Sequence, residues 1–389
     1  MNKKKPATSH KTNQSLQPKR TYKFIVSGGG TGGHIFPAIS IARALEAAAP
    51  GCELLFVGAK GRMEMERVPA VGYRIVGLPI TGIQRSLSAQ NLLFPARLFQ
   101  SLWQATRIVS GFRPDAVVGV GGYASGPLLL AAQLKGIPTF IQEQNAYAGL
   151  TNKWLAGRVR KAYVAYEGMD KYFPADRVVL TGNPIRTDLF ALEHQSAASL
   201  QHFGLSPDRP VLLVIGGSLG ARTLNESVHA GLEALVAAGV QLIWQTGKAY
   251  AAKAAEAVAP FKGQGIFTAP FIDRMDLAFS ASNLIVSRAG AGTISELAVV
   301  GKPVILVPSP HVAEDHQTKN AKALAQRNAA ILIPDDAARE ELLGAAMRML
   351  KDVDSCNRLS AQLKQFDRRN AAAEIATDIL NEIAKGGKS

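Results

Sequence analysis

Three segments of this chain share one pattern: an apolar run ends in glycines and leads into a helical repeat of apolar residues. The first spans 24–49 and contains the loop Ser-Gly-Gly-Gly-Thr-Gly-Gly-His at 27–34; the others begin at Val211 and Leu284. A strand, a glycine-rich turn and a helix N-terminus together present backbone N–H groups and positive partial charge to an anion. Close helix–strand packing would explain one such loop, but three in the same relation to a strand favour ligand-binding loops.

Short apolar runs alternate with helical stretches along the whole chain, which predicts an α/β protein with parallel, doubly wound sheets. The expected strands form two series: 24–27, 54–57, 74–76, 116–120, 139–141, 161–165 and 178–181, then 211–215, 241–245, 266–268, 283–286, 303–307 and 330–333. The break at Asn183-Pro184 and the polar stretch 193–210 separate them. We expect a basic tail at 1–20, an N-terminal domain at 21–188, a C-terminal domain at 189–369, and a helix at 370–389 that packs back on the N-terminal domain.

Charge and composition narrow the classes of partner. The 389 residues carry a formal net charge of +14, of which residues 1–20 supply 6 with no acid, so that polar tail is expected to be disordered. The remaining excess suits an anionic membrane face or phosphorylated substrates, whereas nucleic acid is disfavoured because no basic stripe interleaved with aromatics follows the expected crevice. Two distant cysteines and the lack of an apolar run of about 20 residues indicate a cytoplasmic protein.

The first glycine loop does not match the familiar nucleotide loops. Gly28, Gly30 and Gly33 satisfy G-x-G-x-x-G, but the next strand, 54–57, does not end in the acid that holds a ribose, and His34 stands where a Walker loop has lysine. A phosphate cradle has no need of an imidazole. We therefore interpret His34 as a candidate general base, since its ordinary pKa lies close to 7.

The third loop carries the most informative acid. Glu296 lies about one turn into the helix that follows Gly290-Ala-Gly-Thr293. An anion-binding helix end beside a carboxylate suggests a nucleotide diphosphate, with the carboxylate on the ribose hydroxyls. A glutamate that merely stabilises the helix dipole is the alternative; its place beside a glycine turn favours the functional interpretation.

Further polar residues follow expected strands at the same sheet edges: Tyr123, Ser125, Glu143, Asn145, His316 and Gln317. Amides, hydroxyls and a carboxylate suit sugar and peptide ligands. His311 and His316, with Asp315, could suggest a metal, but no third ligand has helical or β spacing to them, and the loop has no acidic D-x-D pair to hold magnesium on a diphosphate. Neither a metal nor a cofactor is therefore expected. Helix ends, with Arg186 or Arg222, would then meet the diphosphate charge.

The segment 91–107 sets apolar and aromatic residues among arginines. Leu98, Leu102 and Trp103 fall at helical spacing, and such a basic, aromatic helix is typical of a membrane interface. A core helix with an exposed basic face is an equally good interpretation of these residues alone.

Taken in order, the motifs resemble one family. They are Gly29-Gly-Thr-Gly-Gly-His34 with Pro37, Gly121-Gly-Tyr123 with Ser125-Gly-Pro127, Glu143-Gln-Asn145 with Gly149-Leu-Thr-Asn152, Gly182-Asn-Pro184 with Arg186, Gly216-Gly-Ser218 with Gly220-Ala221, Gly290–Glu296, and His316-Gln317. This order is similar to the MurG family (glycosyltransferase family 28), the UDP-N-acetylglucosamine–N-acetylmuramyl-(pentapeptide) pyrophosphoryl-undecaprenol N-acetylglucosamine transferases, or lipid II synthases. The likeness covers about 24–320, and each glycine loop alone is far less specific.

The resemblance implies a GT-B fold, two Rossmann-like domains with a cleft between them. It implies a UDP-GlcNAc donor at the C-terminal domain and the acceptor lipid I at the N-terminal domain, with the protein peripheral on the cytoplasmic face of the bacterial inner membrane, beside other cell-wall synthesis proteins. The implied donor contacts are Thr31, Gly32, Gly33, Asn145, Arg186, Ser218, Ile272, Ala291, Gly292, Thr293, Ile294, Ser295, Glu296 and Gln317. Tyr123 and Ser125 are assigned to the acceptor side, and the implied membrane patch is Leu92, Phe94, Arg97, Leu98, Phe99, Leu102 and Trp103.

The implied chemistry is inverting transfer of GlcNAc to the C4 hydroxyl of the muramoyl sugar. His34 is the expected base, and Glu143 is either the alternative base or the group that orients His34. Three alternatives stay open: a UDP-GlcNAc 2-epimerase, a diacylglycerol glycosyltransferase, and a non-catalytic nucleotide-sugar binder.

Overall fold

The computed structural model describes residues 21–80, 94–185, 189–190, 195–217, 220–312 and 315–386. The tail 1–20 and the predicted site residues Leu92, Arg186 and Ser218 lie outside these ranges, as does the side chain of Phe94.

The first domain is a parallel sheet of seven strands in the order β3-β2-β1-β4-β5-β6-β7. Its strands are β1 (Lys23–Gly28), β2 (Glu53–Ala59), β3 (Ile75–Leu78), β4 (Ala116–Gly121), β5 (Thr139–Glu143), β6 (Lys161–Val164) and β7 (Val178–Leu180). Its helices are α1 (Gly32–Ala48), α2 (Glu64–Ala70), α4 (Phe94–Phe112), α5 (Ser125–Leu134) and α6 (Leu150–Leu155). The strands are continuous apolar runs because helices cover both faces of the sheet. Neither face is solvated, so apolar and polar residues do not alternate along the strands.

The second domain repeats this plan with six parallel strands in the order β10-β9-β8-β11-β12-β13. They are β8 (Val211–Ile215), β9 (Gln241–Gln245), β10 (Ile266–Ala269), β11 (Leu284–Ser287), β12 (Val304–Leu306) and β13 (Ile331–Leu332). The helices are α7 (Ala197–Phe203), α8 (Arg222–Ala230), α9 (Leu232–Ala237), α10 (Ala251–Val258), α11 (Met275–Ala281), α12 (Ala291–Val300), α13 (His316–Ala325), α14 (Ala338–Lys351) and α15 (Val353–Lys364).

In both sheets the winding direction reverses beside the first strand, between β1 and β4 and between β8 and β11. Such switch points leave a crevice at the carboxyl ends of the strands. All three glycine loops follow these strands, since they succeed β1, β8 and β11. The predicted α/β, doubly wound architecture is confirmed.

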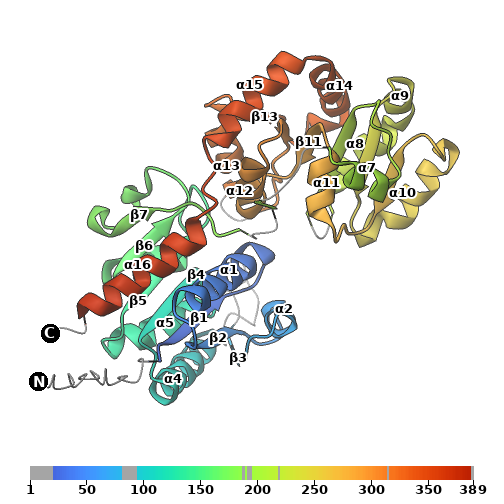
Figure 1. Ribbon diagram of the computed structural model, residues 1–389. Helices are drawn as coiled ribbons and strands as arrows, with labels where there is room; N and C mark the ends of the chain where they lie inside the picture. The colour runs from blue at the N-terminus through green and yellow to red at the C-terminus, as the bar shows by residue number, and fades with distance from the viewer. Residues whose placement is uncertain are drawn as a thin grey trace, which may run out of the picture.

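The last helix, α16 (Ala371–Gly386), returns to the first domain and lies beside α1, as Figure 1 shows in red and blue. Ile375, Ile379 and Ile383 are buried in the same cluster as Phe24 and Val26 of β1. Their spacing of four residues puts them on one face of the helix. The chain therefore crosses between the domains twice.

Residues 195–210, which the sequence suggests as a boundary, contain α7. Ser196 caps this helix, with its Oγ accepting from the Ser199 amide at 3.2 Å. Leu200 and Phe203 are buried in the core of the second domain. The segment is thus part of the packed domain rather than a bare linker.

Candidate active site

His34 stands in the first turn of α1, at the carboxyl edge of the first sheet. Its Nδ1 lies 3.0 Å from the carbonyl oxygen of Gly29 and 3.5 Å from Oγ1 of Thr31. Because a carbonyl oxygen only accepts, Nδ1 must carry the proton in this contact. The lone pair of the neutral ring is therefore on Nε2, the atom that a general base needs.

The ring of His34 packs against Gly121, the last residue of β4. Gly121 has φ +105°, and a Cβ there would lie 2.7 Å from Cδ2 and 2.8 Å from Nε2 of His34. The position thus requires glycine both for its backbone and for the space it leaves. Burial lowers the pKa of His34, and His316 of α13 lowers it further, against opposing effects of Glu143, the Gly29 carbonyl and Glu64. The imidazole is accordingly neutral at pH 7.

Glu143, the alternative base, has both carboxylate oxygens occupied. Oε1 accepts from the amide and the side chain of Asn145 (3.1 and 3.3 Å), and Oε2 accepts from the Gly149 amide and the Asn152 side chain (2.9 Å each). Four donors use the roughly four acceptor positions of a carboxylate. The side chain is 2% exposed, so its part in this structure is to hold the loop that carries Asn145.

Two predicted acceptor residues follow β4 and lie in different surroundings. Tyr123 is 47% exposed, whereas Ser125 is fully buried. The Ser125 hydroxyl is 2.9 Å from the carbonyl of Gly121 and 3.1 Å from that of Ser27. It joins the two loops and is not available to a ligand in this structure.

In the second domain, α12 begins at Ala291 after Gly290, with no side-chain cap and no acid in its first turn. The first N–H groups of a helix have no intrahelical partner, so this end is suited to an anion. Glu296 stands in the second turn and is partly exposed. Because the dipole effect falls off within the first turn, simple dipole stabilisation is a poor explanation for Glu296.

The β8–α8 loop is the other anion-binding candidate of this domain. Gly217 and Gly220 have φ of +81° and +78°, and α8 also begins without a cap or a first-turn acid. Gln245 joins this loop to Ile272, since it donates to the Gly217 carbonyl (2.9 Å) and accepts from the Ile272 amide (3.1 Å). Arg222 is paired with Glu226 on the exposed face of α8.

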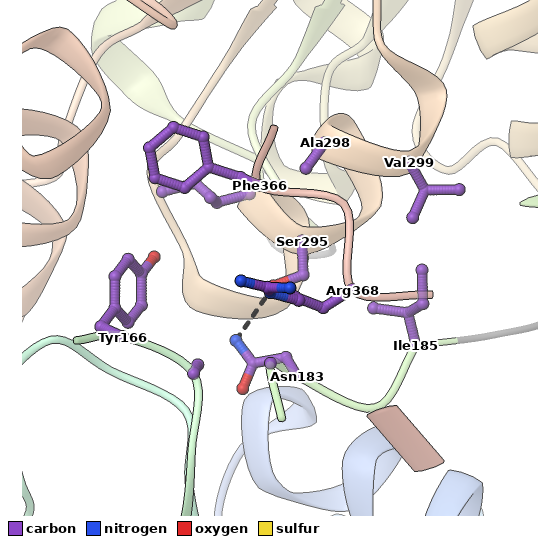
Figure 2. Close-up of a pocket in the computed structure, with 11 residues that line it drawn as sticks. Tyr166, Asn183, Ile185, Ser295, Ala298, Val299, Phe366 and Arg368 are labelled. Atoms are coloured by element: carbon purple, nitrogen blue, oxygen red, sulfur yellow. Dashed lines mark hydrogen bonds between the residues drawn. The ribbon is translucent and has the colours of Figure 1, made fainter. Parts of the chain in front are cut away.

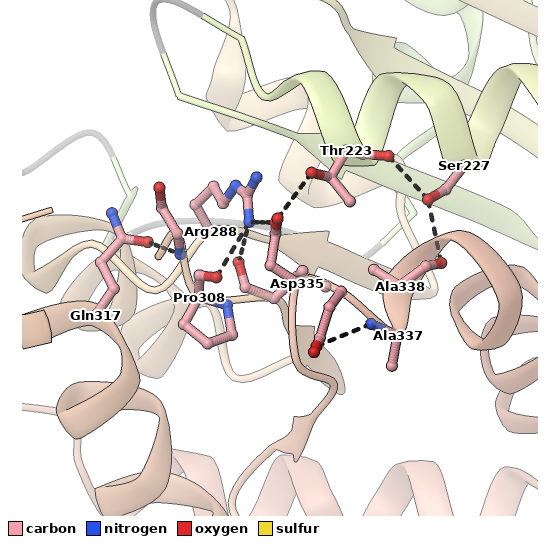
Figure 3. Close-up of polar contacts among 11 residues, drawn as sticks. Thr223, Ser227, Arg288, Pro308, Gln317, Asp335, Ala337 and Ala338 are labelled. Carbon is pink, nitrogen blue, oxygen red and sulfur yellow. Dashed lines mark hydrogen bonds and ion pairs between the residues drawn. The ribbon is translucent and has the colours of Figure 1, made fainter. Parts of the chain in front are cut away.

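A partly buried polar network that the sequence did not suggest holds α8 in place (Figure 3). Arg288, which follows β11, pairs with Asp335 and also donates to the carbonyls of Val307 and Pro308. The other oxygen of Asp335 accepts from Thr223 in the first turn of α8, at 2.9 Å. Nearby, Gln317 accepts from the Ser309 amide at 2.9 Å, which leaves its amide donors for other partners.

Two asparagines join the domains beside these loops. Asn320 of α13 is fully buried; its oxygen accepts from the Ala146 amide (3.1 Å) and its nitrogen lies 3.4 Å from Oδ1 of Asn145. Asn183, in the segment that follows β7, donates to the Gln144 carbonyl (3.1 Å) and to Ser295 (3.0 Å). The loop after β5 is thus linked directly to α13 and, through Asn183, to α12.

Not every predicted donor residue lines the same space. Ile294 and Ser295 border a pocket between the domains, together with Tyr166, Asn183 and Arg368 (Figure 2). Tyr166 belongs to the first domain, and Arg368 precedes α16. Of the described residues in 28–34, 216–222 and 290–293, none lines this pocket.

Comparison with known proteins identifies the family. The N-terminal domain model of glycosyltransferase family 28 matches residues 24–164, and the C-terminal domain model matches 211–378. The chain belongs to glycosyltransferase family 28. A transferase from Parabacteroides distasonis named "UDP-N-acetylglucosamine--N-acetylmuramyl-(pentapeptide) pyrophosphoryl-undecaprenol N-acetylglucosamine transferase" is 50% identical over 94% of this chain and all of its own length. A Porphyromonas gingivalis protein of the same name is 52% identical over 93% of this chain and 96% of its own.

Solved structures agree with this family 28 assignment. The crystal structure of Acinetobacter baumannii MurG matches with a TM-score of 0.75 and 29% identity, over 93% of this chain and all of that one. The fold is therefore GT-B, as the resemblance implies. A UDP-N-acetylglucosamine 2-epimerase matches with a TM-score of 0.65 at 14% identity, over 94% of this chain and 98% of that one, a likeness of fold alone.

Helix α4 of this family 28 chain carries the described residues of the predicted membrane patch, which stays a prediction. Leu98, Phe99 and Trp103 are 40%, 74% and 56% exposed, and the Arg107 guanidinium lies 4.8 Å from the centre of the Trp103 ring. Leu102 instead packs against the core, and Arg97 is partly exposed. Among the described residues, no helix is both long and apolar enough to cross a membrane.

Proposed function

We propose that this chain transfers GlcNAc from UDP-GlcNAc to the C4 hydroxyl of the muramoyl sugar in undecaprenyl-diphosphate-MurNAc-pentapeptide (lipid I), which produces lipid II. Its near full-length likeness to transferases of that name supports the substrates. The observation that carries the chemistry is the presence of two groups on neighbouring helices of the two domains. These are the neutral imidazole of His34 on α1 and the uncapped N-terminus of α12.

The reaction needs one proton acceptor and a stabilised leaving group. The C4 oxygen attacks the anomeric carbon of GlcNAc while the bond to the UDP oxygen breaks, so the configuration inverts. The hydroxyl proton passes to Nε2 of His34, whose other nitrogen is held by Gly29. A base whose pKa is near the working pH suits this step, and Glu143 would act by holding the neighbouring loop.

Charge on the departing diphosphate would be met by the N-termini of α12 and α8 without a metal. Preorganised N–H donors stabilise developing charge without reorganising during the reaction. Glu296 would bind the ribose, while Gln317, Asn145 and the Ile272 backbone complete the donor site. Thr31, Gly32 and Gly33 would approach the donor from the first domain.

The exposed face of α4 would hold the enzyme at an anionic membrane surface on the cytoplasmic side. Phe99 and Trp103 suit insertion between headgroups, and Arg97 and Arg107 suit the lipid phosphates. The acceptor would then reach His34 from the membrane, with Tyr123 beside it.

The test is UDP release from UDP-GlcNAc with and without a lipid I analogue. We expect release only with the analogue, and we expect His34→Ala to lower turnover by about 10²–10⁴-fold with UDP binding retained. His202→Ala, which changes an exposed histidine on α7, is the matched control. Release or epimerisation of UDP-GlcNAc alone would contradict the transferase assignment.

A further inference from the structure

Glu64, the first residue of α2, has its carboxylate inside the first glycine loop. The side chain is 1% exposed. Its Oε2 accepts from the Gly30 amide at 2.8 Å, and its Oε1 accepts from the Ala59 amide at 2.9 Å. Hydrogen bonds to an ionised acceptor are about twice as strong as neutral ones. The Gly30 amide, a donor of the kind that could bind a phosphate oxygen, is thus already bound by a carboxylate of the same chain.

The glycines around this carboxylate are shaped to it. A Cβ added at Gly29 would overlap the Glu64 carboxylate, and one added at Gly58 would lie 2.5 Å from its Cγ. Both positions therefore need glycine because Glu64 fills the space beside them. On this side of the loop the glycines therefore make room for the Glu64 side chain.

The same peptide group contacts both Glu64 and His34. The N–H of Gly30 and the C=O of Gly29 belong to one peptide unit; the N–H is bound by Glu64, and the C=O accepts from Nδ1 of His34. Hydrogen bonds in a chain polarise one another, so a carboxylate on the N–H makes the C=O a stronger acceptor. The arrangement is a carboxylate–histidine pair with one peptide group inserted between the two side chains.

We infer that Glu64 is a positioning residue for the transfer reaction, which fixes the 29–30 peptide so that His34 keeps its proton on Nδ1 and its lone pair on Nε2. This inference rests on the proposed role of His34 as the base. The titratable groups that act on His34 are Glu64 from α2, Glu143 from β5 and His316 from α13. Of these, Glu64 alone is joined to the imidazole through a single peptide group.

The direct test is nitrogen NMR of the histidines in the full-length protein, with the His34 signals assigned through His34→Gln. In the unsubstituted protein we expect His34 as the Nδ1–H tautomer. In Glu64→Gln we expect a larger fraction of the other tautomer and a lower His34 pKa, because a negative charge that favours the imidazolium has been removed. An Nε2–H tautomer in the unsubstituted protein overturns the inference without any variant.

Kinetics give the second readout. Glu64→Gln should lower kcat by about 10–100-fold, a smaller loss than for the base itself. The KM for UDP-GlcNAc should stay within about twofold. The acidic limb of the kcat/KM profile should move to lower pH, a shift that simple loss of folded protein cannot produce. Glu66→Gln, on the exposed face of α2, is the matched control and should resemble the unsubstituted enzyme.

The two proposals fail in different ways. If His34→Ala keeps normal turnover, the base assignment fails, yet the tautomer of His34 still reports on Glu64. If His34→Ala is inactive while a folded Glu64→Gln keeps the tautomer, the pKa and the pH profile unchanged, the role of Glu64 is wrong and the proposed function stands.

Discussion

The hydroxyl of Tyr163 on β6 donates a hydrogen bond to Asp378 on α16, with 2.9 Å between the two oxygens and 215 residues between them in sequence. Burial, together with the negative charge of Asp378, holds the pKa of Tyr163 well above its ordinary value, so the hydroxyl remains a donor. This bond joins the end of the chain to the sheet of the first domain, beside the apolar contacts of Ile375 and Ile379.

Removing this bond should loosen α16. Tyr163→Phe is expected to lower the free energy of unfolding by about 1.5 kcal/mol, the lower end of the range for bonds to a charged group, because Asp378 is partly exposed and can be hydrated. Urea unfolding followed by circular dichroism measures the change. Tyr123→Phe, at an exposed tyrosine, is the control, and equal stability of the two variants would contradict the prediction.

The contact between the domains should depend on Asn320. Asn320→Ala leaves the Ala146 amide without its partner, which is expected to cost about 1–3 kcal/mol. It should also broaden the distribution of domain orientations and lower kcat/KM. Small-angle scattering and steady-state kinetics measure these effects, with Lys322→Ala on the exposed face of the same helix as control. An unchanged scattering profile together with unchanged kinetics would rule out this role.

The Arg288–Asp335 pair should support the donor site. Asp335→Ala leaves a largely buried guanidinium without its counter-ion and is expected to destabilise the protein by about 3 kcal/mol. Thr223→Val, which removes only the hydrogen bond from α8 to Asp335, should cost about 1 kcal/mol. Both should weaken UDP binding, measured by calorimetry. The exposed neighbour Asp336 provides the control Asp336→Ala, and the prediction fails if that variant is as unstable as Asp335→Ala.

Activity should persist below the pH at which an ordinary histidine is protonated. Burial lowers the pKa of His34 from 6.5, so the proton that blocks Nε2 binds only at a pH below that value. We therefore expect the acidic limb of kcat/KM to lie below pH 6.5. A limb above pH 6.5 would mean that another group, or a charged His34, controls the rate.

Stability should depend on pH through Lys302. Burial lowers the pKa of this lysine to about 7, and its Nζ donates to the carbonyls of Ser280 and Ser282 at the end of α11. Below about pH 7 the lysine is charged in both states, while between about 7 and 10.4 the unfolded chain binds more protons, so stability rises with pH in that window.

The comparison with Lys302→Met isolates this effect. The difference in unfolding free energy, unsubstituted protein minus variant, should grow by at most about 1.4 kcal/mol per pH unit from pH 7 to 10. Urea titrations at several pH values measure it. A difference that is flat over this range would show that the folded lysine titrates near its ordinary pKa.

Much of the fold follows from local pattern. The apolar runs near 24, 211 and 284 become β1, β8 and β11 because buried parallel strands need continuous apolar sequence. The glycine loops are predictable from a second local property, since few residues other than glycine adopt positive φ. His34 and Glu296 stood out because they are chemically unusual beside such loops.

The rest depends on contacts between distant segments. Glu64 gives no local sign of its role, because α2 alone does not show that its first side chain reaches back 34 residues to the Gly30 amide. Asp335 and Asn320 likewise show no local sign of their roles, because their partners Thr223 and Ala146 lie 112 and 174 residues away in sequence. Ser125 illustrates the converse, a polar loop residue that packing buries.

The sequence by itself determined that this chain forms two doubly wound domains with glycine loops at their carboxyl edges, because strand length, apolar continuity and backbone freedom are local properties. Only the tertiary structure decided which loop amides a ligand can reach. In the first loop the Gly30 amide is already bound by Glu64, whereas α12 begins without a cap. That difference arises because a hydrogen bond requires its two atoms within about 3 Å, and the folded chain alone sets those distances.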